Sequence, residues 1–131
     1  MRRLSFSNEL VGFWAERHLC TVTTLRADGT PHVVPMGVVL DPRSGQAWAI
    51  TSRHSAKVRN ILAAGDAAHV AVCQVDGRRW STLEGTVRVL TEAPDVQEAE
   101  RRYAARYKVP RENPDRVALR ITLTGLLGNV R

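Results

Sequence analysis

A ten-residue stretch, TSRHSAKVRN at 51–60, gathers the side chains of this sequence best suited to binding an anion. Ser55 is typical of a helix N-cap, and the helix it starts would present free backbone N–H groups at its positive end. Phosphate groups bind at such helix starts, and cations there oppose the helix dipole unless an anion is close. The pattern predicts an anion site at the start of this helix, with Lys57 and Asn60 on the side away from its apolar residues. Spacing alone leaves a second interpretation open, an ordinary capped helix with a solvated basic turn.

The other residue types that commonly carry chemistry form no recognisable motif. The histidines are scattered, with no pair at the spacing of metal ligands: His18, His32, His54 and His69. No Ser-His-Asp or Cys-His arrangement is legible, and Cys20 and Cys73 lie in apolar stretches typical of buried thiols. We therefore expect no metal, no disulfide framework and no hydrolytic activity.

Helices and hairpins must position the anion-binding segment. Apolar periodicity and capping residues predict three helices, over residues 8–17, 55–64 and 93–107. Runs of β-branched residues, two of them leading into Asp-Gly turns, predict strands over residues 19–25, 32–40, 46–51, 67–75, 79–90 and 117–127. The anion-binding segment therefore joins the third strand to the second helix.

The helix predicted over 55–64 separates a core side from a ligand side. Val58, Ile61 and Leu62 share one helical face, which we expect to be buried. Lys57 and Asn60 are three residues apart and project together from the opposite face. Both polar side chains are therefore expected to face a ligand.

The strand predicted over 32–40 contains Pro35 and Gly37. Proline cannot donate to a strand ladder and glycine lacks a side chain, so this strand should be bulged or open to a group approaching its backbone. Successive hairpins without a βαβ repeat favour a mostly β fold, a small antiparallel barrel spanning residues 1–131 as one domain. Such a barrel leaves edges and an apolar face to cover, which predicts a homodimer.

The composition of the 131 residues is that of an ordinary globular protein, 44% hydrophobic and 24% charged. No apolar run approaches the roughly 20 residues of a membrane helix, so we expect a cytoplasmic protein without a membrane partner. A net charge of +6 favours an anionic partner. Nucleic acid is not expected, because the sequence has no zinc finger, helix-turn-helix or aromatic-basic RNA-binding motif.

The order of these segments resembles the split-barrel flavin and deazaflavin oxidoreductases related to pyridoxamine 5′-phosphate oxidase. The resemblance covers nearly the whole chain and rests on ERHLCTVTTLRADGTPHVVPMG, WAITSRHSAKVRNI, AVCQVDGRRWSTLEGTVRV and AERRYAARYKVPRENP. The compact length and the stretches CQVDGRRW and RYAARYKVPRENP are most similar to the biliverdin reductase group that depends on the deazaflavin coenzyme F420. A split antiparallel barrel working as a homodimer is the fold that this resemblance implies.

The resemblance also implies three groups of cofactor-binding residues. The backbone of one strand lies along the deazaflavin ring, at His32, Val33, Val34, Pro35 and Met36. The phosphate and tail of the coenzyme are received by Thr51, Ser52, Lys57 and Asn60. A third group reaches across the dimer interface, namely Arg78, Arg79, Trp80 and Ser81. For Trp80 a position in the core remains an equal alternative. For Arg78 and Arg79 the alternative is simple exposure to solvent.

The implied activity is hydride transfer from reduced F420 to a conjugated acceptor, with biliverdin or another unsaturated tetrapyrrole as the leading small-molecule substrate. Because the coenzyme would supply the hydride, no catalytic side chain is expected. FMN is the alternative cofactor, because it also carries a phosphate and the same barrel binds both ring systems across the superfamily. A non-catalytic carrier of the coenzyme or of haem is a further alternative. Whether the basic stretch 101–108 lines the pocket stays open.

Overall fold

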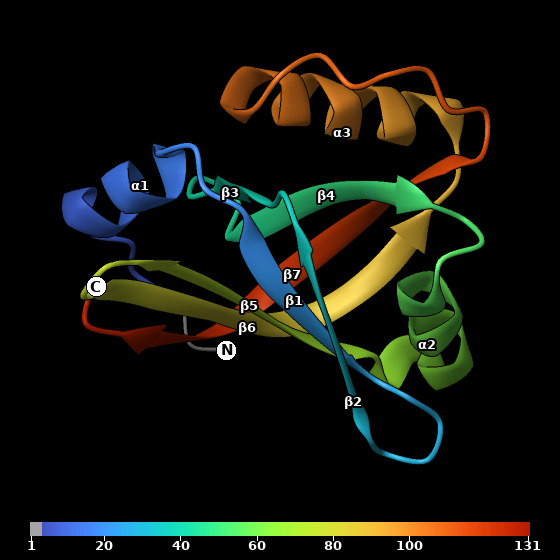
Figure 1. Ribbon diagram of the computed structural model, residues 1–131, viewed down its shortest axis with the longest axis horizontal. Helices are drawn as coiled ribbons and strands as arrows, with labels where there is room; N and C mark the ends of the chain where they lie inside the picture. Colours follow the sequence, from blue (N-terminus) through green and yellow to red (C-terminus); the bar gives the residue numbers. More distant parts are fainter. Residues whose placement is uncertain (1–3) are drawn as a thin grey trace.

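Seven antiparallel strands and three helices make up most of residues 4–131, the part of the chain that the computed structural model describes (Figure 1). The helices are α1 (Asn8–Ala15), α2 (Ala56–Ala64) and α3 (Ala93–Arg106), and a 3₁₀ turn, Gly65–Ala67, follows α2. The strands are β1 (Cys20–Leu25), β2 (Pro31–Met36), β3 (Val39–Asp41), β4 (Gln46–Ser52), β5 (His69–Asp76), β6 (Arg79–Leu90) and β7 (Arg116–Gly128). The predicted mostly β fold is confirmed.

The strands form one sheet in the order β2-β1-β5-β6-β7-β4-β3, so β2 and β3 are its two edges. Only Gly37 and Val38 separate these two strands along the chain. Three residue steps span at most about 11 Å, so the edges must lie close together. The sheet therefore curls on itself into an open antiparallel barrel, as Figure 1 shows.

The single strand predicted over 32–40 is wrong, because the chain bends sharply after Met36. β2 pairs with β1, whereas β3 pairs with β4 at the other edge. A Cβ atom on Gly37 would lie only 2.8 Å from the ring of Tyr107 and 3.0 Å from that of Tyr103. Glycine at the bend therefore lets two rings of the α3 region pack directly on the backbone.

This strand was expected to be bulged or open to an approaching group, and its β2 part pairs with β1 in an unbroken register. A register shift occurs instead between β6 and β7, at Glu84 and Gly85. Pro35 needs no bulge, because β2 is an edge strand and pairs with β1 alone. An edge strand also leaves one side of its backbone open to a ligand.

The ends of the predicted helices differ by one or two residues from the observed ones. α1 stops two residues earlier than predicted, because Glu16 has extended dihedral angles, φ −65° and ψ 148°. α2 begins after Ser55 and ends at Gly65, whose φ of +61° suits glycine. The segment predicted to bind an anion therefore joins a strand end to a helix start, as the sequence indicates.

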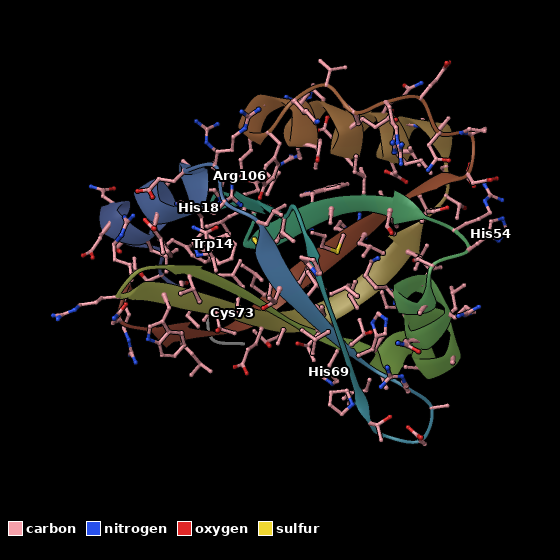
Figure 2. All side chains as sticks on the ribbon, in the orientation of Figure 1. Trp14, His18, His54, His69, Cys73 and Arg106 are labelled. Atoms are coloured by element: carbon pink, nitrogen blue, oxygen red, sulfur yellow. The ribbon has the colours of Figure 1, made fainter. Side chains whose placement is uncertain are left out.

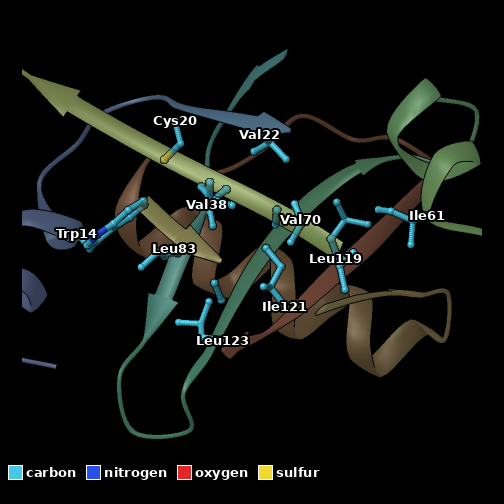
Figure 3. Packing of buried hydrophobic residues seen from close by; sticks show 14 of the residues in the cluster. Trp14, Cys20, Val22, Val38, Ile61, Val70, Leu83, Leu119, Ile121 and Leu123 are labelled. Atoms are coloured by element: carbon cyan, nitrogen blue, oxygen red, sulfur yellow. The ribbon is translucent and has the colours of Figure 1, made fainter. Parts of the chain in front are cut away.

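The barrel interior is a continuous apolar core closed at its two ends by helices (Figures 1 and 3). Leu10, Phe13 and Trp14 of α1 fill one end, and Val58 and Ile61 of α2 fill the other. α3 packs outside the barrel through a second small cluster, in which Ala99 contacts strand residues Trp48 and Ala118. No helix within residues 4–131 is long and apolar enough to cross a membrane, and a cytoplasmic location stays a prediction.

Candidate functional site

The start of α2 carries a cation, Lys57, that has no partner among residues 4–131. Ser55 caps the helix, its Oγ accepting a hydrogen bond from Val58 N at 3.4 Å and lying 3.4 Å from Thr51 Oγ1. Within the described residues Lys57 makes no ion pair or hydrogen bond, although its side chain is partly buried, and this burial lowers its pKa. An anion bound at the helix start would offset that desolvation, so the geometry fits the predicted phosphate site.

Asn60 faces the sheet through a polar contact with β1. Its Nδ2 donates to Thr24 Oγ1 at 3.0 Å, and Thr24 is only 2% exposed. Thr24 is paired directly with His32 of β2, whose Nδ1 is buried and has no hydrogen-bond partner. Two of the predicted site residues, Asn60 and His32, therefore meet around Thr24, and the unpaired nitrogen offers a bound molecule a polar contact.

The predicted faces of α2 need one correction. Val58 and Ile61 are buried as expected, but Leu62 is 64% exposed. α2 covers the end of the barrel with only a narrow apolar stripe. The hydrogen bond from Asn60 to the sheet orients the helix so that Leu62 lies outside this stripe. Asn60 thus belongs to the side that contacts the sheet, and Lys57 keeps the freer position.

The predicted ring-binding strand β2 presents two different faces. The pairing with β1 places His32, Val34 and Met36 on the inner side, where each is partly buried. Val33 and Pro35 point outward, and Val33 is 55% exposed. Side chains of these five residues therefore cannot all contact one ligand within a single chain, although the open edge of the backbone can be shared.

A cleft of about 680 Å³ joins the ends of β2 and β4 to the segment that follows α3. It brings together three predicted residues, Met36, Thr51 and Ser52. The remaining lining includes the apolar or small residues Leu19, Gly37, Ile50, Val109 and Pro110 and the polar residues Tyr103, Lys108, Arg111, Asn113 and Arg116. Volumes of this size are typical of small-molecule sites.

The polar lining was not among the residues predicted from the sequence. The basic stretch near residue 108 and the prolines at 110 and 114 were visible, but helical periodicity did not indicate which way they face. The structure answers the open question about this stretch residue by residue. Arg101 is exposed and pairs with Glu98, and Arg102 pairs with Asp41 at 3.1 Å. Of the cations in this stretch, only Lys108 lines the cleft, together with Tyr103.

Arg106 and Tyr107 fix the bend beside the cleft. The Arg106 guanidinium donates to the carbonyl of Glu16 at 2.7 and 3.0 Å and also contacts Val38 O and Gln74. The Tyr107 hydroxyl donates to His18 O at 2.7 Å, and burial raises its pKa above the ordinary value. Figure 2 shows Arg106 reaching from the end of α3 toward Trp14 and His18.

The residues Arg78 to Ser81 lie at the far end of the sheet from α2 (Figure 1). Arg78 is exposed, and Arg79 pairs with Asp76 and with Glu16 at 2.8 Å. Trp80 is 40% exposed, so it is a surface residue. Ser81 is fully buried and accepts a hydrogen bond from Trp14 Nε1 at 2.9 Å, which leaves it no surface for a ligand.

One group of side chains has the composition of a metal site. Ligand atoms of Glu16, His18 and Asp76 lie within 4.8 Å of one another. Arg79 occupies this group already, because it bonds to both carboxylates. Its interactions lower the pKa of Glu16 to about 2, with His18 as the second cause. We interpret the group as an ion-pair cluster that joins α1 to the β5–β6 hairpin.

The open antiparallel barrel, with the predicted anion site at the start of α2, matches a known protein family. The family model described as pyridoxamine 5′-phosphate oxidase matches residues 6–128, and this chain belongs to that family. The chain is also 43% identical over 123 residues to an F420H(2)-dependent biliverdin reductase of Mycobacterium tuberculosis (strain CDC 1551 / Oshkosh). That match covers 94% of this chain and 88% of the relative.

Solved structures share the fold at lower sequence identity. An F420 reductase superposes with a TM-score of 0.71 at 23% identity, covering 88% of this chain and 94% of its own. A conserved hypothetical protein of Mycobacterium tuberculosis superposes with a TM-score of 0.78 at 21% identity, covering 95% of this chain and 84% of its own. The split-barrel resemblance seen in the sequence is thus confirmed.

Proposed function

We propose that this chain is an F420-dependent reductase that transfers a hydride to a conjugated acceptor of the biliverdin class. The observation that carries the proposal is the 43% identity, over 94% of the chain, to a reductase with that cofactor and substrate in its name. The site supports it independently, because the partly buried Lys57 and the unpaired His32 Nδ1 offer contacts that a phosphate-bearing coenzyme needs.

When bound, the deazaflavin coenzyme supplies the hydride itself. The chain's own residues then bind, orient and shield. Lys57 and the capped start of α2 would hold the phosphate, and the open edge of β2 would face the ring. The apolar lining of the cleft, with Met36 and Ile50, would keep water from the reacting carbon. No side chain of this chain is assigned as a proton donor.

An absorbance titration tests the cofactor directly. Saturable binding of F420 with no binding of FMN supports the proposal, and the reverse result replaces it by an FMN-dependent oxidase or reductase of the same fold. Reduced F420 is then mixed with biliverdin, quinones and enones. Coenzyme binding without turnover of any acceptor would indicate a carrier instead of an enzyme.

We also propose that the working form is a homodimer. Strand pairing places five exposed apolar side chains on the outer face of β1, β2, β5, β6 and β7: Leu25, Val33, Val75, Trp80 and Leu127. Exposed apolar faces of this kind are typical of interaction surfaces. A second copy would also bring Arg78 and Trp80, distant from α2 in one chain, toward the partner's cofactor site.

Light scattering after size exclusion tests the dimer. We expect Val75→Asp to yield monomers, since Val75 is 61% exposed on this face. Leu62→Asp is the matched control, because Leu62 is similarly exposed at 64% but lies on α2, outside the face. A wild-type monomer, or equal effects of the two substitutions, would contradict the proposed interface.

A further inference from the structure

The cleft has a strongly one-sided charge. Three cationic residues line it, Lys108, Arg111 and Arg116, and no Asp or Glu is among its lining residues within the described chain. Arg116 is already engaged, because it donates to Glu100 at 2.9 Å and its side chain is only 9% exposed. Lys108 and Arg111 make no ion pair or hydrogen bond within residues 4–131. Two cations are therefore free to bind an anionic group in the cleft.

The apolar side of the same cleft indicates what the anion is attached to. Leu19, 65% exposed, and Val109, 82% exposed, stand at its rim, and Met36 and Ile50 lie deeper. Exposed apolar side chains beside two unpaired cations suit a ligand with an extended apolar or conjugated body and acidic substituents. A purely hydrophobic ligand would leave the two cations without partners.

The segment that carries the two cations is held at both ends. Before it, the Tyr107 hydroxyl donates to His18 O at 2.7 Å. After it, Arg53 N donates to Asp115 O at 2.9 Å, and Arg116 N donates to Asn113 O at 3.1 Å. Pro110 restricts the backbone between these anchors. The cations are thus presented from a defined loop, which reduces the entropy lost when a ligand binds.

We propose that Lys108 and Arg111 bind carboxylate groups of the acceptor and thereby select acidic conjugated substrates. This inference rests on the proposed reductase function. The coenzyme tail of glutamates offers the same chemistry, and Thr51 and Ser52 of the predicted phosphate site line the cleft, although Lys57 and Asn60 do not. The cleft also meets the predicted ring-binding strand at Met36, where an acceptor must reach the ring. We therefore assign the carboxylates to the acceptor, and binding of F420 with and without its glutamates tests the other source.

The test compares wild type with Lys108→Ala/Arg111→Ala. Biliverdin, which carries two carboxylates, is compared with its dimethyl ester, both as a substrate of the F420-loaded enzyme and by absorbance titration without coenzyme. We expect KM and Kd for biliverdin to rise about five- to tenfold, because each exposed charge pair contributes modestly and two are removed. KM and Kd for the dimethyl ester should rise less than twofold in the double variant. The kcat for biliverdin should change little.

The control variant is Arg43→Ala, which removes an exposed cation from the β3–β4 turn. The cleft meets β4 from Ile50 onward, four residues after the strand begins, so this turn lies on the order of 13 Å or more from that part of the cleft. We expect it to leave all constants unchanged. Higher salt should raise the wild-type KM for biliverdin and affect the double variant less.

Three outcomes would overturn the inference. The first is an equal loss of affinity for biliverdin and for its ester. The second is that the double variant binds F420 more weakly than wild type does but binds a form of the coenzyme without glutamates equally well. This result would assign the two cations to the coenzyme tail. The third is no binding of biliverdin by wild type. Biliverdin bound through the two cations but never reduced would instead contradict the reductase function and leave the binding assignment standing.

Discussion

Replacing Lys57 by alanine should weaken coenzyme binding far more than any other single loss of charge on α2. The ammonium group is partly buried and unpaired, so a phosphate that it contacts gains a charge-assisted hydrogen bond. Such bonds contribute about 1.5 to 3 kcal/mol, and each 1.4 kcal/mol is tenfold in affinity. The dissociation constant for F420 should therefore rise by roughly ten- to a hundredfold.

The assay is a fluorescence titration of F420 with wild type, Lys57→Ala and Lys57→Arg. Arg59→Ala is the matched control, since Arg59 is an exposed cation two residues further along α2. A deazaflavin without phosphate and tail should bind wild type and Lys57→Ala equally. The reasoning is refuted if F420 affinity is unchanged in Lys57→Ala, or if affinity for the phosphate-free deazaflavin falls by the same factor. Thermal unfolding confirms that each variant is folded.

The remaining predictions concern pH and the bend after β2. Burial lowers the pKa of Lys57 below 10.5, and a bound phosphate would raise it again, so F420 affinity should be full below the free-state pKa and lost at higher pH. A flat affinity profile up to about pH 10.5 would contradict this. Gly37→Ala should lower the free energy of unfolding by about 1 to 3 kcal/mol in urea, because its Cβ meets the ring of Tyr107. The control Gly12→Ala, with open space around it, should stabilise α1 by up to about 1 kcal/mol, and equal effects of both would exclude a steric cause. Glu16, whose pKa falls from 4.5 to about 2, should add stability that is lost as the pH drops through that interval. Glu16→Gln should therefore flatten the decrease of Tm in acid, and an unchanged slope would argue against the ion pair.

Local physical chemistry explains why most of the fold could be predicted from the sequence. β-branched runs and Asp-Gly turns indicate strands and hairpins without reference to distant residues. The strand over 32–40 was predicted wrongly because its break depends on contacts from α3, whose Tyr103 and Tyr107 pack on Gly37. Leu62 was wrongly predicted to be buried for a similar reason. Helical periodicity indicates which side of α2 is apolar, but the neighbouring sheet decides how much of that side is covered.

The residues of the candidate site also divide into those that a local pattern indicates and those that only the fold brings together. The sequence by itself determined the capped start of α2 and predicted an anion site there, because a capping serine, a lysine and a helix N-terminus are local features. Only the tertiary structure decided that Lys108 and Arg111 share a cleft with Met36 and Thr51, which are more than 50 residues away along the chain. That proximity arises because the sheet curls until its ends meet the segment after α3, and no local pattern records such a closure.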